Sequence, residues 1–480
     1  MSRLLRTSRF APVAFRTFVA VAHVIAFACA GAAAARPPAP ASVHPVSGES
    51  GFTLVFEGIA DVAYRVWQSQ TPPKVVVDLE APVSGSGIDG LRDPAIAQVR
   101  IGDGPLGTRV VIDLNYALPR PLVEEEPGRL RVVVPTRFRI AQEVSIARGV
   151  VYGTVRAGEA HGPVSVKYLK VDPGRGGIAV VPGLAGETFG RAGLRDIAYR
   201  AGAIAGINGG FFHWTGRPLG LFIQDGELVS EAINRRAAFG IDGNGRPFIE
   251  RLSTRLWLET PYGDVEVDGI NRPRNRGEIV VYTTAFGPLS GGGQWLFVDD
   301  GRIVGDGRGV DDIGTAAGSP RSLRGNSFAL RFDPAEPRVA GLRPGDPVVF
   351  RYDVSPAPPG GVRHAIGGGP QLVRDGEIAV TGEDERFQPD VLLGRAPRSA
   401  VGITRAGQVL LVVVDGRDGA RSTGATLHEL AEWMIRLGAV SAMNLDGGGS
   451  STLVANGVIL NQPSDGAERP IATAILVFPS

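Results

Sequence analysis

Short apolar runs, broken every few positions by glycine or proline, recur along most of the chain. Between residues 46 and 135 these runs alternate or are β-branched, a pattern typical of strands. Further along, tight-turn dipeptides stand between pairs of apolar runs, at Asp225-Gly226, Asp375-Gly376 and Asn456-Gly457. Such dipeptides supply the positive φ angles of two-residue hairpins. The pattern therefore predicts a chain built mainly of antiparallel sheet.

Two stretches carry the period of a helix instead. Thr426 and Glu429 form a capping box, with apolar residues on one face behind it and Gly438 where a C-terminal cap belongs. The stretch Leu194–Ala201, which ends at Gly202, has the same period. We therefore expect an α+β fold class, in which a small N-terminal β-sandwich precedes a larger sheet-rich α+β catalytic domain with a few helices.

The first 35 residues have the pattern of an export signal. Four arginines precede an apolar run at 18–30, and small residues close the segment at 31–35. The run is short for a membrane span, so we expect cleavage near Ala35, no transmembrane span afterwards, and a location in the periplasm or cell envelope. Cys29, the only cysteine, is the alternative site of lipid attachment. Ala26 disfavours that alternative, because a lipobox usually carries an aliphatic residue there.

Changes in composition and the positions of glycine and proline divide the remaining chain into segments. We expect a Pro/Ala-rich tether at 36–45, a β-sandwich at 46–135, a linker at 136–147 and a larger domain at 148–480. The apolar fraction of 43% and the charged fraction of 21% are those of a globular protein. With a formal net charge of +1 and no basic run, nucleic acid is not an expected partner.

The range 46–135 resembles the AMIN domain of exported cell-wall proteins. Val99-Arg100-Ile101-Gly102 and the stretch from Thr108 to Leu114 carry most of the resemblance. It implies that this domain binds peptidoglycan or another envelope glycan. A spacer without a ligand is the alternative, because a fold does not fix a function.

A unit of helix, glycine, strand and asparagine occurs twice. Arg200–Asn208 aligns with Arg436–Asn444 without a gap, and an Arg, a Gly, an Ala and the final Asn coincide. Strand ends next to tight turns are where ligand-contacting side chains emerge. We therefore expect Asn208 and Asn444 to contact a sugar or a water molecule.

The second copy continues into Asp446, three glycines and a run of hydroxyl residues. Consecutive glycines let backbone amides approach a ligand and can form an anion-binding nest. Asp446 could orient a sugar, hold a water or bind a metal. The alternative is an Asx turn, in which the aspartate caps its own backbone.

Two arginines and a second aspartate lie between the two copies of the unit. Arg398 and Arg417 are candidates for phosphate recognition, because a guanidinium matches two phosphate oxygens at once. Asp415 follows the apolar run Val409–Val414, where a carboxylate is costly unless it is paired or functional. A salt bridge from Asp415 to a nearby arginine is the alternative.

From about residue 148 to 480 these segments resemble the phosphodiester glycosidase family. The matching stretches, in chain order, are Asn208–Phe212, Gly367–Pro370, Arg398–Gly402, Val414–Arg417, Asn444–Ser451 and Glu468–Pro470. The resemblance implies hydrolysis at an anomeric carbon of a carbohydrate phosphodiester, with an N-acetylglucosamine-like sugar and phosphate oxygen as leaving group. The sequence departs from the family at Ala396, where a polar residue is common, and fits only loosely at 250–313.

The resemblance gives the catalytic carboxylate roles to Asp446 and Asp415. The substrate-binding residues it implies are Asn208, Gly209, Arg398, Ser399, Arg417, Asn444, Gly447, Gly448, Gly449, Ser450, Ser451, Glu468 and Arg469. No cofactor is expected and the six histidines form no metal-ligand cluster in sequence, although oxygen ligands could hold a divalent cation. Two rival functions stay open: a metal-dependent phosphodiesterase that attacks phosphorus, and a non-catalytic cell-wall glycan-binding protein.

Overall fold

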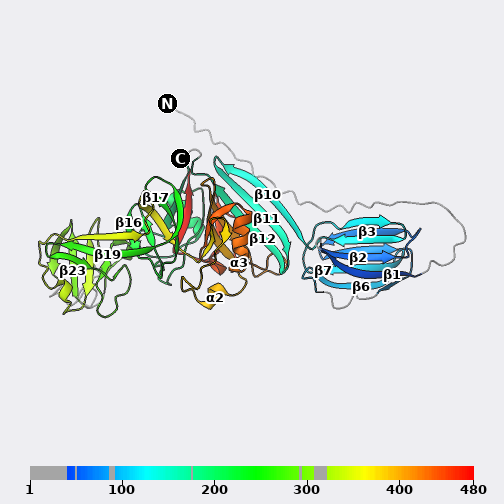
Figure 1. The fold of residues 1–480 in the computed structure, drawn as a ribbon, viewed down its shortest axis with the longest axis horizontal. Coiled ribbons are helices and arrows are strands. Elements are labelled where there is room, and N and C mark those ends of the chain that lie inside the picture. Colours follow the sequence, from blue (N-terminus) through cyan, green and yellow to red (C-terminus); the bar gives the residue numbers. More distant parts are fainter. Residues whose placement is uncertain are drawn as a thin grey trace, which may run out of the picture. The chain divides into compact units, whose positions relative to one another are not determined.

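The computed structural model describes residues 40–48, 51–85, 92–174, 177–290, 294–306 and 322–479. The chain divides into two compact units, the second of which begins at Arg137 (Figure 1). Strands make up 51% of the described residues and helices 8%, so the sheet-rich character is confirmed but the fold is closer to all-β than to the α+β class we expected. The expected signal segment, with Cys29, and residues 36–39 of the expected tether lie outside the described residues.

The first unit contains two sheets. One has the strand order β5-β1-β2-β9-β8 and the other β3-β4-β7-β6. Their bounds are β1 (Ala41–Gly48), β2 (Gly51–Glu57), β3 (Tyr64–Gln70), β4 (Pro73–Leu79), β5 (Val83–Gly85), β6 (Ile96–Gly104), β7 (Gly107–Leu114), β8 (Leu122–Glu126) and β9 (Arg129–Val134). Strand β1 begins inside the range expected as a tether, because Ala41 and Val43 are buried and the strand pairs with β2.

The second unit is organised around a sheet of eight strands. Their order is β10-β11-β12-β31-β30-β32-β28-β29. The bounds are β10 (Phe138–Ala147), β11 (Val150–Glu159), β12 (Gly162–Val171), β28 (Gln371–Arg374), β29 (Glu377–Ile378), β30 (Arg398–Thr404), β31 (Val409–Val414) and β32 (Ala439–Asn444). Residues 138–147, which we expected to form a linker, are therefore an edge strand, and its backbone pairs with β11 over its whole length.

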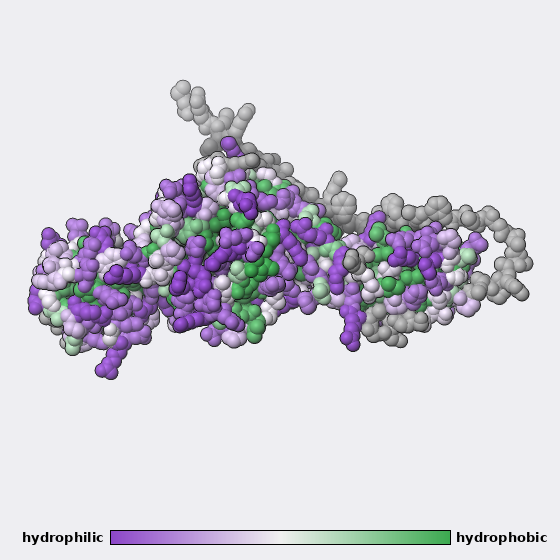
Figure 2. Space-filling view, viewed as in Figure 1, coloured by the Kyte–Doolittle hydropathy of each residue, from purple (hydrophilic) through white to green (hydrophobic). Residues whose placement is uncertain are grey.

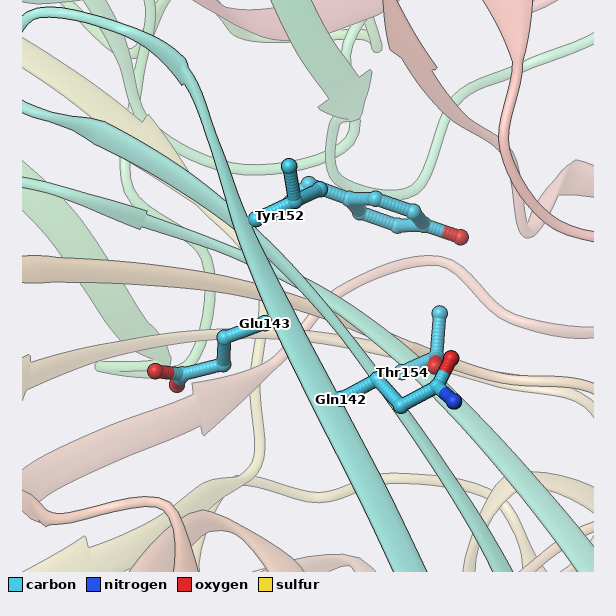
Figure 3. A pocket seen from close by; sticks show the side chains of 5 residues that line it. Gln142, Glu143, Tyr152 and Thr154 are labelled. Atoms are coloured by element: carbon cyan, nitrogen blue, oxygen red, sulfur yellow. The ribbon is translucent and has the colours of Figure 1, made fainter.

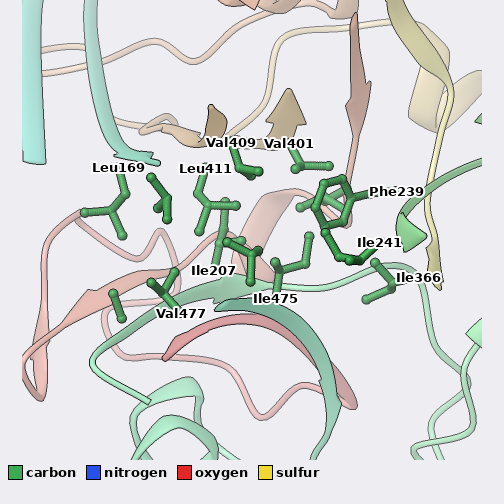
Figure 4. Packing of buried hydrophobic residues seen from close by; sticks show 14 of the residues in the cluster. Leu169, Ile207, Phe239, Ile241, Ile366, Val401, Val409, Leu411, Ile475 and Val477 are labelled. Atoms are coloured by element: carbon green, nitrogen blue, oxygen red, sulfur yellow. The ribbon is translucent and has the colours of Figure 1, made fainter. Parts of the chain in front are cut away.

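A second sheet packs against one face of this large sheet. Its order is β13-β35-β14-β33-β34, with β13 (Ala179–Leu184), β14 (Ala205–Asn208), β33 (Leu453–Ala455), β34 (Val458–Ile459) and β35 (Thr473–Phe478). Leu169, Val401 and Leu411 of the large sheet meet Ile207 and Ile475 of the second in one buried cluster (Figure 4). The alternation of apolar residues in β30 and β31 thus places this core between the two sheets.

Two helices pack against faces of the two sheets. Helix α3 (Leu427–Arg436) buries Leu430 and Met434 with side chains from the other face of the large sheet, and α1 (Leu194–Ala201) packs on the second sheet. Both were expected, and the capping box and the left-handed Gly202 are confirmed. A short helix, α2, spans Pro389–Leu392. No helix in the described ranges has the length and apolarity needed to cross a membrane.

Three further sheets complete the second unit. Their orders are β16-β15-β27-β17-β18, β20-β19-β26 and β21-β22-β25-β23-β24. The bounds are β15 (Phe222–Gln224), β16 (Glu227–Ser230), β17 (Ala237–Asp242), β18 (Pro247–Arg251), β19 (Ser253–Thr260), β20 (Gly263–Glu266), β21 (Gly269–Ile270), β22 (Val280–Tyr282), β23 (Gln294–Asp299), β24 (Arg302–Asp306), β25 (Phe328–Phe332), β26 (Val349–Ser355) and β27 (Val362–Gly367). The three predicted hairpins are confirmed, with positive φ at both turn residues of each. On the face in Figure 2, hydrophilic residues cover most of the surface, with smaller apolar areas between them.

Candidate active site

The two copies of the repeated unit end side by side. Strand β14 of the second sheet ends at Asn208, and β32 of the large sheet ends at Asn444. The amide of Asp446 donates to the carbonyl of Gly209 at 3.1 Å. We call residues 446–451 the glycine turn, and this hydrogen bond joins it to the end of the other copy.

Asn208 is fully buried and all of its hydrogen-bonding capacity is used within the protein. Its Nδ2 donates to the carbonyls of Asp446 at 2.7 Å and Gly209 at 3.3 Å. Its Oδ1 accepts from Ser399 Oγ at 2.7 Å and from the amide of Thr452 at 3.1 Å. Two donors and two acceptor sites are the full capacity of an amide side chain. This geometry favours a role in positioning over the sugar contact that we expected.

Asn444 has a related arrangement. Its Nδ2 donates to the carbonyls of Leu445 at 2.6 Å and Gly369 at 2.9 Å. In both copies, then, the terminal Asn donates to the carbonyl of the next residue and to a carbonyl brought in from elsewhere in the chain. The two asparagines define the path of the backbone on either side of the glycine turn.

Asp446 lies at the start of the glycine turn with its carboxyl mostly withdrawn from water. Burial raises the pKa of Asp446 to about 6, against the opposing influence of the Ser450 hydroxyl, the Arg469 guanidinium and the amide of Gly447. A carboxyl whose pKa is shifted toward neutrality by burial beside a cation is typical of functional sites. Asp446 can therefore exchange a proton or carry a charge near physiological pH.

The glycines of the turn admit two guanidinium groups. A Cβ atom on Gly449 would overlap Arg469 Nη2 and Asp465 Oδ2, and one on Gly448 would lie 3.2 Å from Arg417 Nη2. Arg469 donates to Asp465 Oδ2 from Nε at 2.9 Å and from Nη2 at 2.7 Å. The absence of side chains on this turn is therefore what allows the two cations to approach its backbone.

Arg417 remains open to a ligand. Its backbone is left-handed, with φ of 64°, and its Nη1 donates to Ser464 Oγ at 3.2 Å and lies 3.8 Å from Asp465 Oδ1. The side chain is 53% exposed, so guanidinium N–H groups stay accessible. Among the two arginines predicted to bind phosphate, Arg417 has the geometry for it.

Arg398 has a different environment. The alternation of β30 places it on the face opposite Ser399, and it is buried. Its Nε, Nη1 and Nη2 donate to the carbonyls of Ala425, Val391 and Gly394 at 3.0, 3.2 and 2.9 Å. Burial lowers the pKa of Arg398 to about 10. These contacts hold together the segments behind the glycine turn and favour a structural contribution.

Asp415 is also buried, and its oxygens are engaged. Oδ1 accepts from the amide of Gln462 at 2.9 Å and from Asn461 Nδ2 at 3.3 Å, and Oδ2 accepts from Ser165 Oγ at 3.2 Å. The cation nearest to it is Lys167, 3.8 Å away, and not an arginine. Burial raises the pKa of Asp415, while these hydrogen bonds and the Lys167 charge act in the opposite direction.

Asn461 connects Asp415 to the glycine turn. Its Nδ2 donates to the carbonyl of Ser451 at 3.0 Å as well as to Asp415, and its Oδ1 accepts from the amide of Leu453. The segment 461–469, which we call the 461–469 loop, thus hydrogen-bonds to Asp415 at one end, and the charge of Arg469 at its other end acts on Asp446. Asn461, Asp465 and Lys167 were not anticipated, because no local motif distinguishes them from surface polar residues.

The remaining predicted residues have mixed surroundings. Glu468 accepts from the amide of Arg195 at 3.2 Å and from its Nε at 2.9 Å, so it caps the start of α1. Four buried hydroxyls near the turn make no hydrogen bond of ordinary geometry within the described ranges: Ser450, Ser451, Thr452 and Thr473. In the same part of the chain, no group of three or more His, Cys, Asp or Glu side chains is placed to hold a metal ion.

Comparison with known families defines a class for this part of the chain. Residues 298–478 match the family model described as phosphodiester glycosidase. The matched range contains the glycine turn, Asp415 and the 461–469 loop, and Asn208 lies ahead of it.

Particular relatives carry a more specific name. The chain is 43% identical over 89 residues to N-acetylglucosamine-1-phosphodiester alpha-N-acetylglucosaminidase of Bos taurus, covering 18% of this chain and 16% of the bovine protein. It is 30% identical over 194 residues to the protein of that name from Mus musculus, covering 37% of this chain and 34% of the mouse protein. The chain thus spans about a third or less of the length of these relatives.

A solved structure shares the fold over a longer range. The crystal structure of a hypothetical protein from Synechocystis superposes with a TM-score of 0.63 at 23% identity, covering 93% of this chain and 82% of that chain. At this identity the likeness concerns the fold alone.

Proposed function

We propose that the second unit is an exported glycosidase that releases an N-acetylglucosamine-like sugar from a sugar-1-phosphodiester in envelope glycan or exopolysaccharide. The first unit would bind envelope glycan and keep the enzyme near its substrate. The single observation that carries the proposal is the partly buried carboxyl of Asp446, with a pKa raised to about 6, in a glycine turn flanked by Arg417 and Arg469. The family match at 298–478 and the names of the curated relatives support it.

In this proposal the aspartate and the two arginines of the site have different roles in the reaction. The ionised carboxylate of Asp446 stabilises positive charge at the anomeric carbon or activates the attacking water, since both require a fixed negative charge next to that carbon. Arg417 and Arg469 hold the phosphate, whose oxygen leaves with the electron pair of the glycosidic bond. A phosphate monoester is a good leaving group, so little proton donation is needed.

The surroundings of the two aspartates favour different roles for them. Asp415 accepts three hydrogen bonds from Gln462, Asn461 and Ser165 and faces Lys167. A carboxylate engaged in this way fixes the 461–469 loop, while Asp446 keeps its charge available for the substrate. We therefore propose Asp446 as the catalytic carboxylate and Asp415 as a positioning residue.

The test is a product analysis with purified protein and N-acetylglucosamine-1-phospho-methyl diester. Free N-acetylglucosamine and methyl phosphate are expected, because the bond to the anomeric carbon breaks. N-acetylglucosamine-1-phosphate and methanol would instead mean attack at phosphorus, and the absence of any product would favour a glycan-binding protein. Asp446→Asn should lower the rate of product formation by about a hundredfold or more. Asp353→Asn, an exposed position on β26, is the matched control and should leave it unchanged.

A further inference from the structure

A hollow of about 400 Å³ lies on the β10–β11 ribbon of the second unit. Gln142, Glu143, Val144, Tyr152 and Thr154 line it (Figure 3). Gln142 pairs with Thr154 and Val144 with Tyr152 across the two strands, so these four side chains share one face of the ribbon. Figure 3 shows Glu143 pointing the other way, where it accepts from the Tyr168 hydroxyl at 2.6 Å.

This hollow lies next to the network around Asp415. Thr154 stands directly opposite Lys167 on the neighbouring strand β12, and Lys167 Nζ lies 3.8 Å from Asp415 Oδ2. Tyr152 reaches from the hollow to the carbonyl of Leu460 at 3.5 Å, one residue before Asn461. Burial and the charge of Asp415 raise the pKa of Tyr152, which agrees with this closeness.

The lining suits a neutral polar ring. The side chains of Gln142 and Thr154 make no hydrogen bond within the described ranges, so their amide and hydroxyl groups are available to a ligand. Val144, 55% exposed, and Tyr152 supply apolar and aromatic surface between them. Saccharides present hydroxyls at the edge and C–H groups on the face of the ring, and sites for them combine these two kinds of group.

We propose that this hollow binds the saccharide attached to the far side of the scissile phosphate. The inference rests on the proposed function, in which Asp446 faces the anomeric carbon and Arg417 holds the phosphate. Arg417 and Asp415 lie two residues apart. Asp415 lies beside Lys167, which stands opposite Thr154 on β11. A substrate that enters with its anomeric carbon at Asp446 therefore places its leaving group toward β11 and β10.

The test compares two diesters with the same scissile bond. One carries a methyl group on the phosphate and the other carries tri-N-acetylchitotriose. We expect the KM of the wild-type protein to be lower for the trisaccharide diester by about fivefold, the contribution of one good hydrogen bond. Gln142→Ala and Thr154→Val should raise the KM for the trisaccharide diester to the value for the methyl diester. The KM for the methyl diester should stay unchanged in these variants. Arg139→Ala, on the opposite face of β10, is the control.

Equal KM values for the two diesters in the wild type, or an equal rise for both in the variants, would overturn the proposal. Titration calorimetry with free tri-N-acetylchitotriose separates this result from a failure of the proposed function. Binding that the Gln142→Ala/Thr154→Val double variant loses supports the saccharide site even if neither diester is cleaved. Binding that this variant keeps, or no binding by the wild type, counts against the site whatever the diesters show.

Discussion

At the scale of single residues, Asp446 connects stability with chemistry. An aspartate in an unfolded chain has a pKa of about 3.9, and burial raises that of Asp446 to about 6 in the folded protein. The folded protein therefore binds this proton more tightly than the unfolded chain. The stabilisation that follows is fully present below about pH 4 and is lost as the pH rises through 6. At neutral pH the ionised carboxylate of Asp446 therefore lowers the free energy of unfolding.

Asp446→Asn should consequently stabilise the protein at pH 8, because the variant has no buried charge. The difference in pKa corresponds to at most about 3 kcal/mol in the free energy of unfolding, and the gain should shrink at pH 4.5. Denaturant unfolding at the two pH values measures it. Turnover should fall by about a hundredfold or more in the same preparation. A less stable variant with near-normal turnover would identify Asp446 as the cap of an Asx turn.

The same pKa predicts how activity depends on pH. If Asp446 acts as a carboxylate, kcat/KM should rise with pH through about 6 and level off above it, since kcat/KM follows the ionisation of the free enzyme. Steady-state rates on the methyl diester from pH 4.5 to 8 provide the profile. A kcat/KM that falls above pH 6 would show that Asp446 works in its protonated form, as a proton donor.

At the scale of elements, the sequence predicted the local structure of the site better than its contacts. Both helices, the three hairpins and the two strands that end in asparagine follow from local signals: caps, turn residues and apolar periods. The partners of those asparagines do not, because Ser399 and Thr452 reach Asn208 only when two sheets come together. Arg398 and Ser399 are adjacent in sequence, yet the pleat of β30 sends them to different cores. The α+β class rested on the two expected helices, but these are short, and helices make up only 8% of the described residues against 51% for strands.

Replacing Asn208 should therefore damage the fold. Asn208→Ala removes four hydrogen bonds and leaves Ser399 Oγ and three backbone groups buried without that partner, so a loss of about 2–4 kcal/mol in the free energy of unfolding is expected. Ser399→Ala removes one of the four and should cost about 1 kcal/mol. Chemical denaturation of both variants gives the comparison. Wild-type stability in Asn208→Ala would mean that the asparagine is free to contact substrate.

Gly449→Ala tests the glycine turn as an element. The added Cβ would overlap Arg469 Nη2 and Asp465 Oδ2, which are the mobile ends of side chains, so the fold should persist while the guanidinium moves away. Turnover should drop by about tenfold or more with little change in melting temperature. Gly419→Ala is the matched control, because nothing lies within 4 Å of its Cβ position. Unchanged kinetics in Gly449→Ala would remove Arg469 from phosphate binding.

At the scale of the whole molecule, the proposed chemistry belongs to one of the two units. Each residue of the candidate site lies beyond Arg137, and the family match begins later still, at residue 298. A chain that begins at Arg137 should therefore fold and cleave the methyl diester with near-normal kcat/KM, while binding to purified envelope glycan decreases. Circular dichroism verifies folding, and a sedimentation assay measures glycan binding. A folded truncation without turnover would mean that the units share the site.

The doubled asparagine arrangement also determines how the site can move. Because Asn208 and Asn444 anchor the backbone on both sides of the glycine turn to the ends of two packed sheets, the turn cannot swing without separating those sheets. A site of this kind is preorganised. Its contacts with the sugar are set before the ligand arrives, and the exposed arginines are the groups with freedom to adjust. Release of product should then depend on the ligand leaving its contacts and not on the opening of this turn.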